Sequence, residues 1–195
     1  ASTGLSWGPR AQPKPIISGN MEVWQRGTAF AAAATGTFSA DRWKWAQSGA
    51  GVVTLNRSTN VPTVGQAGVL FNYSLEVDVT TVDAAIGAGD YYLLTYAIEG
   101  YNWRHFAQRN LILSFWAMSP KTGHHTVAVQ NSGTDRTFTG TYQIAVADTW
   151  EFQTIILTAS PTAGTWSYTT GVGANIIFTL AAGTTYQTSN TGWET

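Results

Sequence analysis

Short segments in which apolar and polar residues alternate at every second position are the feature that most limits the folds open to this chain. In YSLEVDVT, residues 73–80, the apolar side chains of Leu75, Val77 and Val79 alternate with acidic and hydroxyl side chains. This period of two is typical of a strand with one face buried and one face in solvent. NLILSFWAM, residues 110–118, also alternates, but it carries apolar bulk on both faces. That pattern predicts a central strand that is covered on both sides. Further strands are expected at residues 52–57, 125–132, 149–159 and 175–180.

Turn-forming residues separate these segments. SGAG precedes Val52, NSGTD follows Gln130 and SPTAG follows Ala159, and such clusters of Gly, Ser, Asn, Asp and Pro favour reversals of the chain. About eight to ten strands at this spacing indicate a β-sandwich or a barrel. No long amphipathic helix is expected. Residues 29–34 are interpreted as a loop despite their alanines, and residues 101–110 are expected to hold one helical turn.

The charge composition excludes several classes of partner. Only 11% of the residues are charged and the formal net charge is -1, whereas an average globular protein carries roughly a quarter of charged residues. Lys and Arg form no run, so a basic surface that neutralises nucleic-acid phosphates or anionic lipids is not expected. The chain has no Cys, which excludes disulfides and thiolate zinc sites.

The sequence is interpreted as one domain preceded by a linker. Its 195 residues suffice for a single hydrophobic core. Residues 1–15 contain Pro9, Pro13 and Pro15 and have no apolar signal core, so they are expected to be an extended linker, and residues 16–195 the folded domain. The longest apolar segments, such as residues 176–182, are too short to cross a bilayer.

Side chains that could carry out catalysis are sparse. The chain contains no G-x-S-x-G elbow and no Gly-rich phosphate loop. Two of its three histidines, His124 and His125, are neighbours, so on a strand they face opposite sides and are poorly placed to share a metal. The 11 acids are scattered singly, whereas glycoside hydrolysis needs two carboxylates that converge. Glu99 lies among aromatic residues, but one acid does not make a glycosidase, and we expect no enzymatic activity.

Aromatic residues are the stronger candidates for a binding site. Aromatics make up 13% of the chain, with nine Trp. Trp43 and Trp45 stand two positions apart in DRWKW, on one face of an expected strand, and Tyr101 and Trp103 occur in GYNWRHF. Exposed rings of this kind stack on the apolar faces of sugars. The sequence also fits the alternative that these four rings fill the core of a sandwich.

Five motifs in a fixed order resemble a known family. They are IISGNMEVWQRGT, FSADRWKW, YAIEGYNWRHFAQRNLILSFWAMS, VAVQNSG and DTWEFQTIIL. This order resembles a family of bacteriophage and prophage tail-fibre or virion proteins, in which W-Q-R-G-T is followed by A-D-R-W. The later segments resemble carbohydrate-binding modules of the family 4, 9 and 22 type. The resemblance covers residues 16–195.

The resemblance implies a jelly-roll β-sandwich of two antiparallel sheets that is displayed on the outside of a virion, on its tail or capsid. Such modules bind host-surface glycans or decorate the particle, assemble with other virion proteins and are often homotrimers. Related sandwiches hold a structural calcium through an early acid, which corresponds to Glu22. The family continues beyond the G-W-x-T segment, so we expect that this chain lacks its last strand or strands and that another chain replaces them.

An alternative function is a carbohydrate-binding module of a secreted polysaccharide-degrading enzyme, since a sandwich rich in aromatics fits that role too. The opening motif is interpreted as a fold signature. If residues 17–26 are extended, Trp24 packs against the sandwich and Arg26 forms a buried pair with a carboxylate, which we expect to be Asp41.

Overall fold

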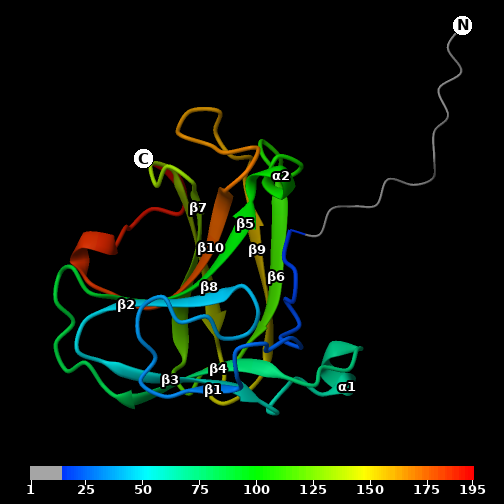
Figure 1. Ribbon diagram of the computed structural model, residues 1–195, viewed down its shortest axis with the longest axis vertical. Helices are drawn as coiled ribbons and strands as arrows, with labels where there is room; N and C mark the ends of the chain where they lie inside the picture. The colour runs from blue at the N-terminus through cyan, green and yellow to red at the C-terminus, as the bar shows by residue number, and fades with distance from the viewer. Residues whose placement is uncertain (1–14) are drawn as a thin grey trace, which may run out of the picture.

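A computed structural model describes residues 15–195 of the chain, so the linker expected at residues 1–15 lies outside the described part except for Pro15. Strands dominate, as the alternating pattern predicts, and the helices are single turns (Figure 1). The strands are β1 (Ala29–Phe30), β2 (Trp43–Ser48), β3 (Val52–Ser58), β4 (Ser74–Thr81), β5 (Tyr91–Glu99), β6 (Leu111–Ala117), β7 (Gly123–Asn131), β8 (Thr137–Ile144), β9 (Glu151–Leu157), β10 (Val172–Ala182) and β11 (Gly192–Glu194). The helices are α1 (Val64–Ala67), α2 (Gly100–Trp103) and the 3-10 turn η1 (Thr184–Tyr186).

Two layers of antiparallel sheet form the sandwich. One layer is a six-stranded sheet in the order β11-β8-β7-β10-β5-β2. The other consists of a three-stranded sheet, β1-β3-β4, and a two-stranded sheet, β6-β9. The chain changes layer repeatedly, for example from β4 to β5 and from β5 to β6, as in a jelly roll. The prediction of an all-β sandwich of antiparallel sheets is therefore confirmed.

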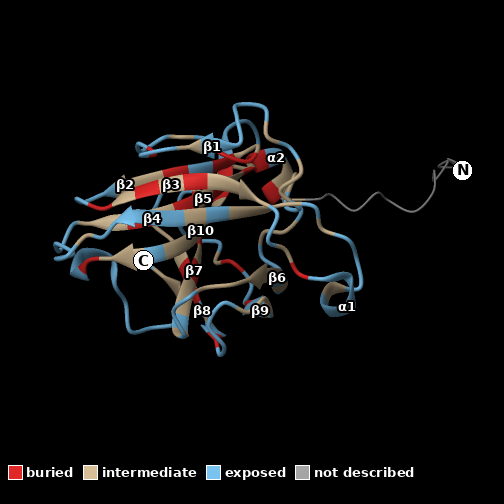
Figure 2. Cartoon of the chain, turned by 90° about the horizontal axis from the view of Figure 1, so that it is seen from below, coloured by how far each residue is buried: buried red, intermediate tan, exposed pale blue. Residues whose placement is uncertain are grey.

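The core is divided between the two parts of the second layer. Val53 and Leu55 of β3 pack with Trp45 and Tyr92, while Ile155 of β9 packs in a larger cluster with residues of β5, β7, β8 and β10. Buried residues concentrate on the inward faces of the strands, and α1 and the loops are largely exposed (Figure 2). Alternate residues of β5 are buried from end to end, so one face of this strand lies against the core along its whole length.

The second layer is open between its two parts. Among the described residues, β4 pairs only with β3, and β6 pairs only with β9. The expectation that β6 is a central strand is wrong: β6 lies at an edge, and only one of its faces is covered. The last strand, β11, pairs with β8 at the edge of the other layer. The sandwich is thus not a closed, fully paired unit.

The opening motif forms turns rather than a strand. Ser18 and Met21 have positive φ angles, 58° and 57°, and the indole N–H of Trp24 donates to the Met21 carbonyl at 2.6 Å. These reversals prevent the extended conformation expected for residues 17–26. Trp24 nevertheless packs on the larger core cluster. Arg26 pairs with Asp41 at 3.9 Å as expected, but at the surface instead of in the interior.

Candidate functional site

The structure buries three of the four aromatic candidates. Relative exposure is 4% for Trp43, 0% for Trp45 and 2% for Trp103, but 49% for Tyr101. The alternation of β2 turns Trp43 and Trp45 inward and Lys44, between them, outward. The spacing of two thus predicts their common face correctly, and that face is the inner one.

The buried rings pack against other rings. Trp43 lies 5.1 Å from the Tyr96 ring, and Trp103 stacks on Trp166 at 5.8 Å with an interplanar angle of 10°. A ring enclosed in this way has no free face for a sugar, so the stacking role expected for Trp43, Trp45 and Trp103 is corrected to a core role. Tyr101 is exposed on α2, where the Arg104 guanidinium lies 5.2 Å from its ring centroid.

Glu22 does not sit in a cluster of acids. Its Oε1 accepts a hydrogen bond from the Asn72 side-chain amide at 3.1 Å. Calcium takes about six to eight oxygen ligands, mostly carboxylates and carbonyls. Within residues 15–195 no group of three or more His, Cys, Asp or Glu side chains comes together. The surroundings of Glu22 therefore do not supply the carboxylate cluster typical of a calcium site.

Glu99 is held in an ion pair. Its carboxylate accepts from the Arg42 guanidinium and from the Asn102 side-chain amide at 3.1 Å. Burial alone would raise the pKa of Glu99, but the hydrogen bonds from Arg42 and Asn102 and the Arg42 charge together hold it below its ordinary range. A general acid needs a raised pKa, so this carboxylate is suited to fixing the start of α2.

The outer face of the six-stranded sheet forms a shallow groove of about 920 Å³. The strand register places its residues in rows that cross the sheet. One row runs from Lys44 through Thr95, Ile177 and Ala128 to Thr139. Neighbouring rows add further side chains that point outward into the groove: Ala46, Leu93, Thr126, Gln130, Thr137, Thr141, Asn175 and Thr179. Hydroxyl and amide groups thus alternate with apolar groups over the floor, and Lys44 stands at its β2 edge.

The segment after β10 forms one wall of this groove. η1 and residues 187–191 line it, and Tyr186 is 57% exposed. The Tyr186 ring meets the Tyr91 ring edge to face, with centroids 5.4 Å apart and an interplanar angle of 88°. The backbone N–H of Gly183 donates to the Asp90 carbonyl at 2.8 Å, which fastens the wall to the loop before β5. The groove therefore has a polar floor and a pair of rings at one end.

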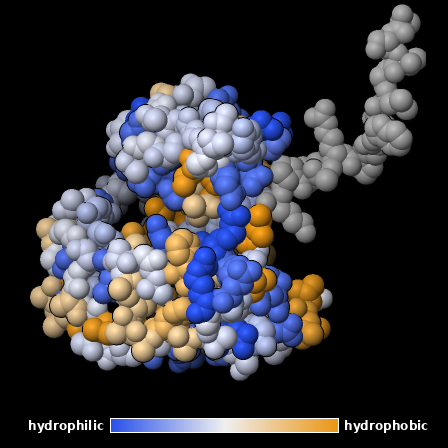
Figure 3. Space-filling view, in the orientation of Figure 1, coloured by the Kyte–Doolittle hydropathy of each residue, from blue (hydrophilic) through white to orange (hydrophobic). Residues whose placement is uncertain are grey.

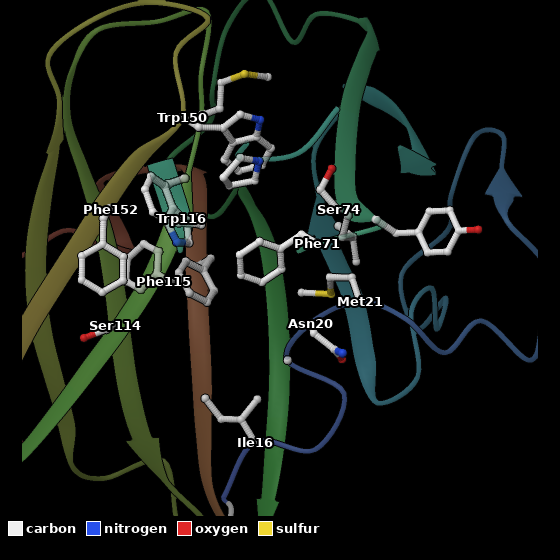
Figure 4. A pocket seen from close by; sticks show the side chains of 18 of the residues that line it. Ile16, Asn20, Met21, Phe71, Ser74, Ser114, Phe115, Trp116, Trp150 and Phe152 are labelled. Atoms are coloured by element: carbon white, nitrogen blue, oxygen red, sulfur yellow. The ribbon is translucent and has the colours of Figure 1, made fainter. Parts of the chain in front are cut away.

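A second hollow opens between β4 and β6. This seam cleft, about 670 Å³, is lined by Phe115, Trp116, Trp150 and Phe152 on one side and by Met21, Phe71 and Ser74 on the other (Figure 4). Its floor includes Leu94 and Phe178 from the six-stranded sheet. In the space-filling view, apolar residues lie inside and around a hollow in the middle of the face drawn (Figure 3). Burial raises the pKa of Tyr142, which also lines the cleft, to about 12.

Three carboxyl groups have pKa values that are lowered by the hydrogen bonds they accept, and these shifts determine how the stability of the fold depends on pH. The Tyr92 hydroxyl lowers the pKa of Asp83, the Asn131 amide that of Asp135, and backbone N–H groups of Val146 and Ala145 that of Glu151. A carboxyl whose pKa is lower in the folded state contributes stability above its unfolded pKa and loses it as the pH falls through the folded value.

We therefore expect a melting temperature that is flat near neutral pH and falls once the pH drops below the ordinary values of 4.5 for Glu and 3.8 for Asp. Thermal melts followed by circular dichroism across the acid range check this. The variant Glu151→Gln should show a shallower acid decline, and an unchanged acid profile in that variant would contradict the assignment.

Comparisons with known proteins give a similarity among solved structures and none among family models or curated proteins. No protein-family model matches the chain, and no curated protein matches it. Among solved structures, the chain is similar to the enzymatically active domain of bacteriophage CBA120 tailspike protein 4, with a TM-score of 0.45 and 19% sequence identity. The similarity covers 76% of this chain and 20% of the tailspike chain. The chain thus spans about a fifth of the length of that protein.

Proposed function

We propose that this chain is a virion component of a bacteriophage, of tail-appendage type, that binds a host-surface glycan in the groove on the outer face of its six-stranded sheet. The observation that supports glycan binding most strongly is the polar lining of this groove. The order of the W-Q-R-G-T, A-D-R-W and L-S-F-W-A motifs supports the assignment to a virion, where the domain would assemble with other tail or capsid proteins.

The chemistry of the groove suits a sugar chain. Sugars present hydroxyl groups around their rings and small apolar patches on the ring faces, so they are bound by amides, hydroxyls and an aromatic platform. The groove offers the amides of Gln130 and Asn175, a row of threonine hydroxyls and the exposed ring of Tyr186. Because it crosses several strands, it accommodates a chain of sugar units rather than a single ring.

The lining of the groove favours binding of a glycan without cleavage of its glycosidic bonds. Cleavage of a glycosidic bond needs two carboxylates about 5 to 10 Å apart. Glu194 is the only Asp or Glu among the described residues that line the groove. Glu99 pairs with Arg42 and is not part of the lining. We therefore propose a non-enzymatic role, in which adsorption rather than hydrolysis is the contribution of this domain.

Replacing Tyr186 by serine should weaken glycan binding about tenfold, which corresponds to ~1.4 kcal/mol, because the groove loses its exposed ring. The measurement is a glycan array with host polysaccharides, followed by calorimetric titration of the glycan that binds. Tyr101→Ser is the matched control, since Tyr101 is similarly exposed but lies on α2, away from the groove. If Tyr101→Ser abolished binding and Tyr186→Ser did not, the site would lie at α2 and the groove assignment would fall.

A further inference from the structure

The two-stranded β6–β9 sheet exposes an uncharged apolar face. The register pairs Ile112 with Ile156, Ser114 with Thr154, and Trp116 with Phe152. We call these six residues the β6–β9 strip. Relative exposure is 70% for Ile112, 69% for Ile156 and 57% for Phe152, and the Trp116 and Phe152 rings lie 5.4 Å apart. The opposite face of the same strands, with Leu113 and Ile155, packs on the core.

This strip lacks the features that keep exposed strands apart. Natural sheet edges and faces carry Lys, Glu or Pro, or are covered, and monomers seldom expose contiguous apolar patches beyond a few hundred Å². β4, on the other side of the seam cleft, carries Glu76 and Asp78 between its apolar residues, whereas β6 has no charged residue. The pattern of LILSFWA, apolar on both faces, is typical of a strand covered on both sides.

We propose that a second copy of this chain covers the β6–β9 strip, face to face about a two-fold axis. The strip is self-complementary, as a two-fold interface requires. With an axis that runs across both strands at the Ser114–Thr154 pair, the two isoleucines of one copy lie against Trp116 and Phe152 of the other. Branched aliphatic side chains then pack on rings at both ends, and hydroxyl groups meet hydroxyl groups in the centre.

The electrostatics permits two copies to meet here. The strip holds no charge to desolvate, and burial of unpaired charge is what most opposes association. The formal net charge of -1 gives little repulsion between copies. Ser114, Trp116 and Phe152 also line the seam cleft (Figure 4), so the second copy would cover one side of its mouth.

Sedimentation velocity in the micromolar range tests the association. The chain is expected to dimerise with rising concentration, and Ile112→Thr with Ile156→Thr should weaken dimerisation at least tenfold. At a concentration low enough for both proteins to be monomers, the double variant should keep the melting temperature, because threonine keeps the β-branch. Val82→Thr is the matched control, as Val82 is 73% exposed in a loop. A monomer at every concentration, a trimer, or equal effects of the control and the double variant would overturn the proposal.

A cross-link tests the arrangement. The chain has no Cys, so Ser114→Cys introduces a single thiol close to the axis. Packed sheets lie about 10 Å apart, beyond the Cα separation of a disulfide. A short bismaleimide should therefore join two copies, whereas oxidation should not. A disulfide formed on oxidation would indicate pairing of β6 edges and overturn face packing.

The groove lies on the other layer, so a monomeric double variant should still bind glycan. Failure of this proposal is therefore distinguishable from failure of the glycan site.

Discussion

Replacing Trp45 by alanine is expected to lower the free energy of unfolding by about 3–5 kcal/mol, the range for large-to-small changes of buried aromatic residues. Trp45 is fully buried, in a cluster with Ala33, Val53, Leu55 and Tyr92. This cluster joins β3 to β2 and β5, so it attaches the three-stranded sheet to the six-stranded one. The cavity left by the indole cannot be filled without moving β3, whose backbone is held by two neighbours.

Urea unfolding followed by tryptophan fluorescence or circular dichroism measures this loss. Trp45→Phe, which keeps an aromatic ring but loses the hydrogen bond from the indole N–H to Gln47 Oε1 at 2.8 Å, should cost clearly less. Tyr101→Ala, at an exposed ring, should cost least. A loss below about 1 kcal/mol for Trp45→Ala, the range of surface substitutions, would contradict the core position of this ring.

Period-two patterns predict much of this fold because one face of most strands meets solvent. β3, β4, β7, β9 and β10 all appear where alternation predicts them. The expected strands do not include β5, in which YYLLTYAIE carries apolar side chains at most positions and the alternation shows only in burial. β8, with TFTGTYQI, was also missed, because threonine is found both in strands and in turns.

The candidate site was harder to predict from the sequence for a geometric reason. Trp43 and Trp45 share a face, as their spacing predicts, but spacing does not distinguish the inner face from the outer one. The groove is assembled from six strands, β2, β5, β7, β8, β10 and β11, most of which are distant in the sequence, so no local motif predicts it. The one local signal is Thr137, Thr139 and Thr141, a row of small polar side chains on the outward face of β8. Its cross-strand partners follow only from the register.

Asn131→Ala is expected to cost about 3 kcal/mol, because it removes four hydrogen bonds made by a fully buried side chain, each with a net worth of about 0.5–1.5 kcal/mol. Asn131 is 0% exposed. Its side-chain amide donates to the Thr165 carbonyl at 2.9 Å and to the Asp135 carboxylate at 2.5 Å. Its Oδ1 accepts from the backbone N–H groups of Asp135 and Arg136, both at 3.1 Å. One side chain thus ties the β7–β8 turn to the loop before β10.

This residue also connects stability to the proposed site. It ends β7 next to Gln130, which lines the groove and donates to the Thr137 hydroxyl at 3.2 Å. Loosening the turn should therefore weaken glycan binding as well as folding. Ser132→Ala is the control. Its half-buried hydroxyl donates to the same Thr165 carbonyl at 3.0 Å and accepts from the Ser167 backbone N–H at 3.0 Å, so this variant loses two hydrogen bonds rather than four and should cost clearly less than Asn131→Ala. Chemical unfolding gives the stability difference, and equal losses in the two variants would show that Asn131 does not organise the turn.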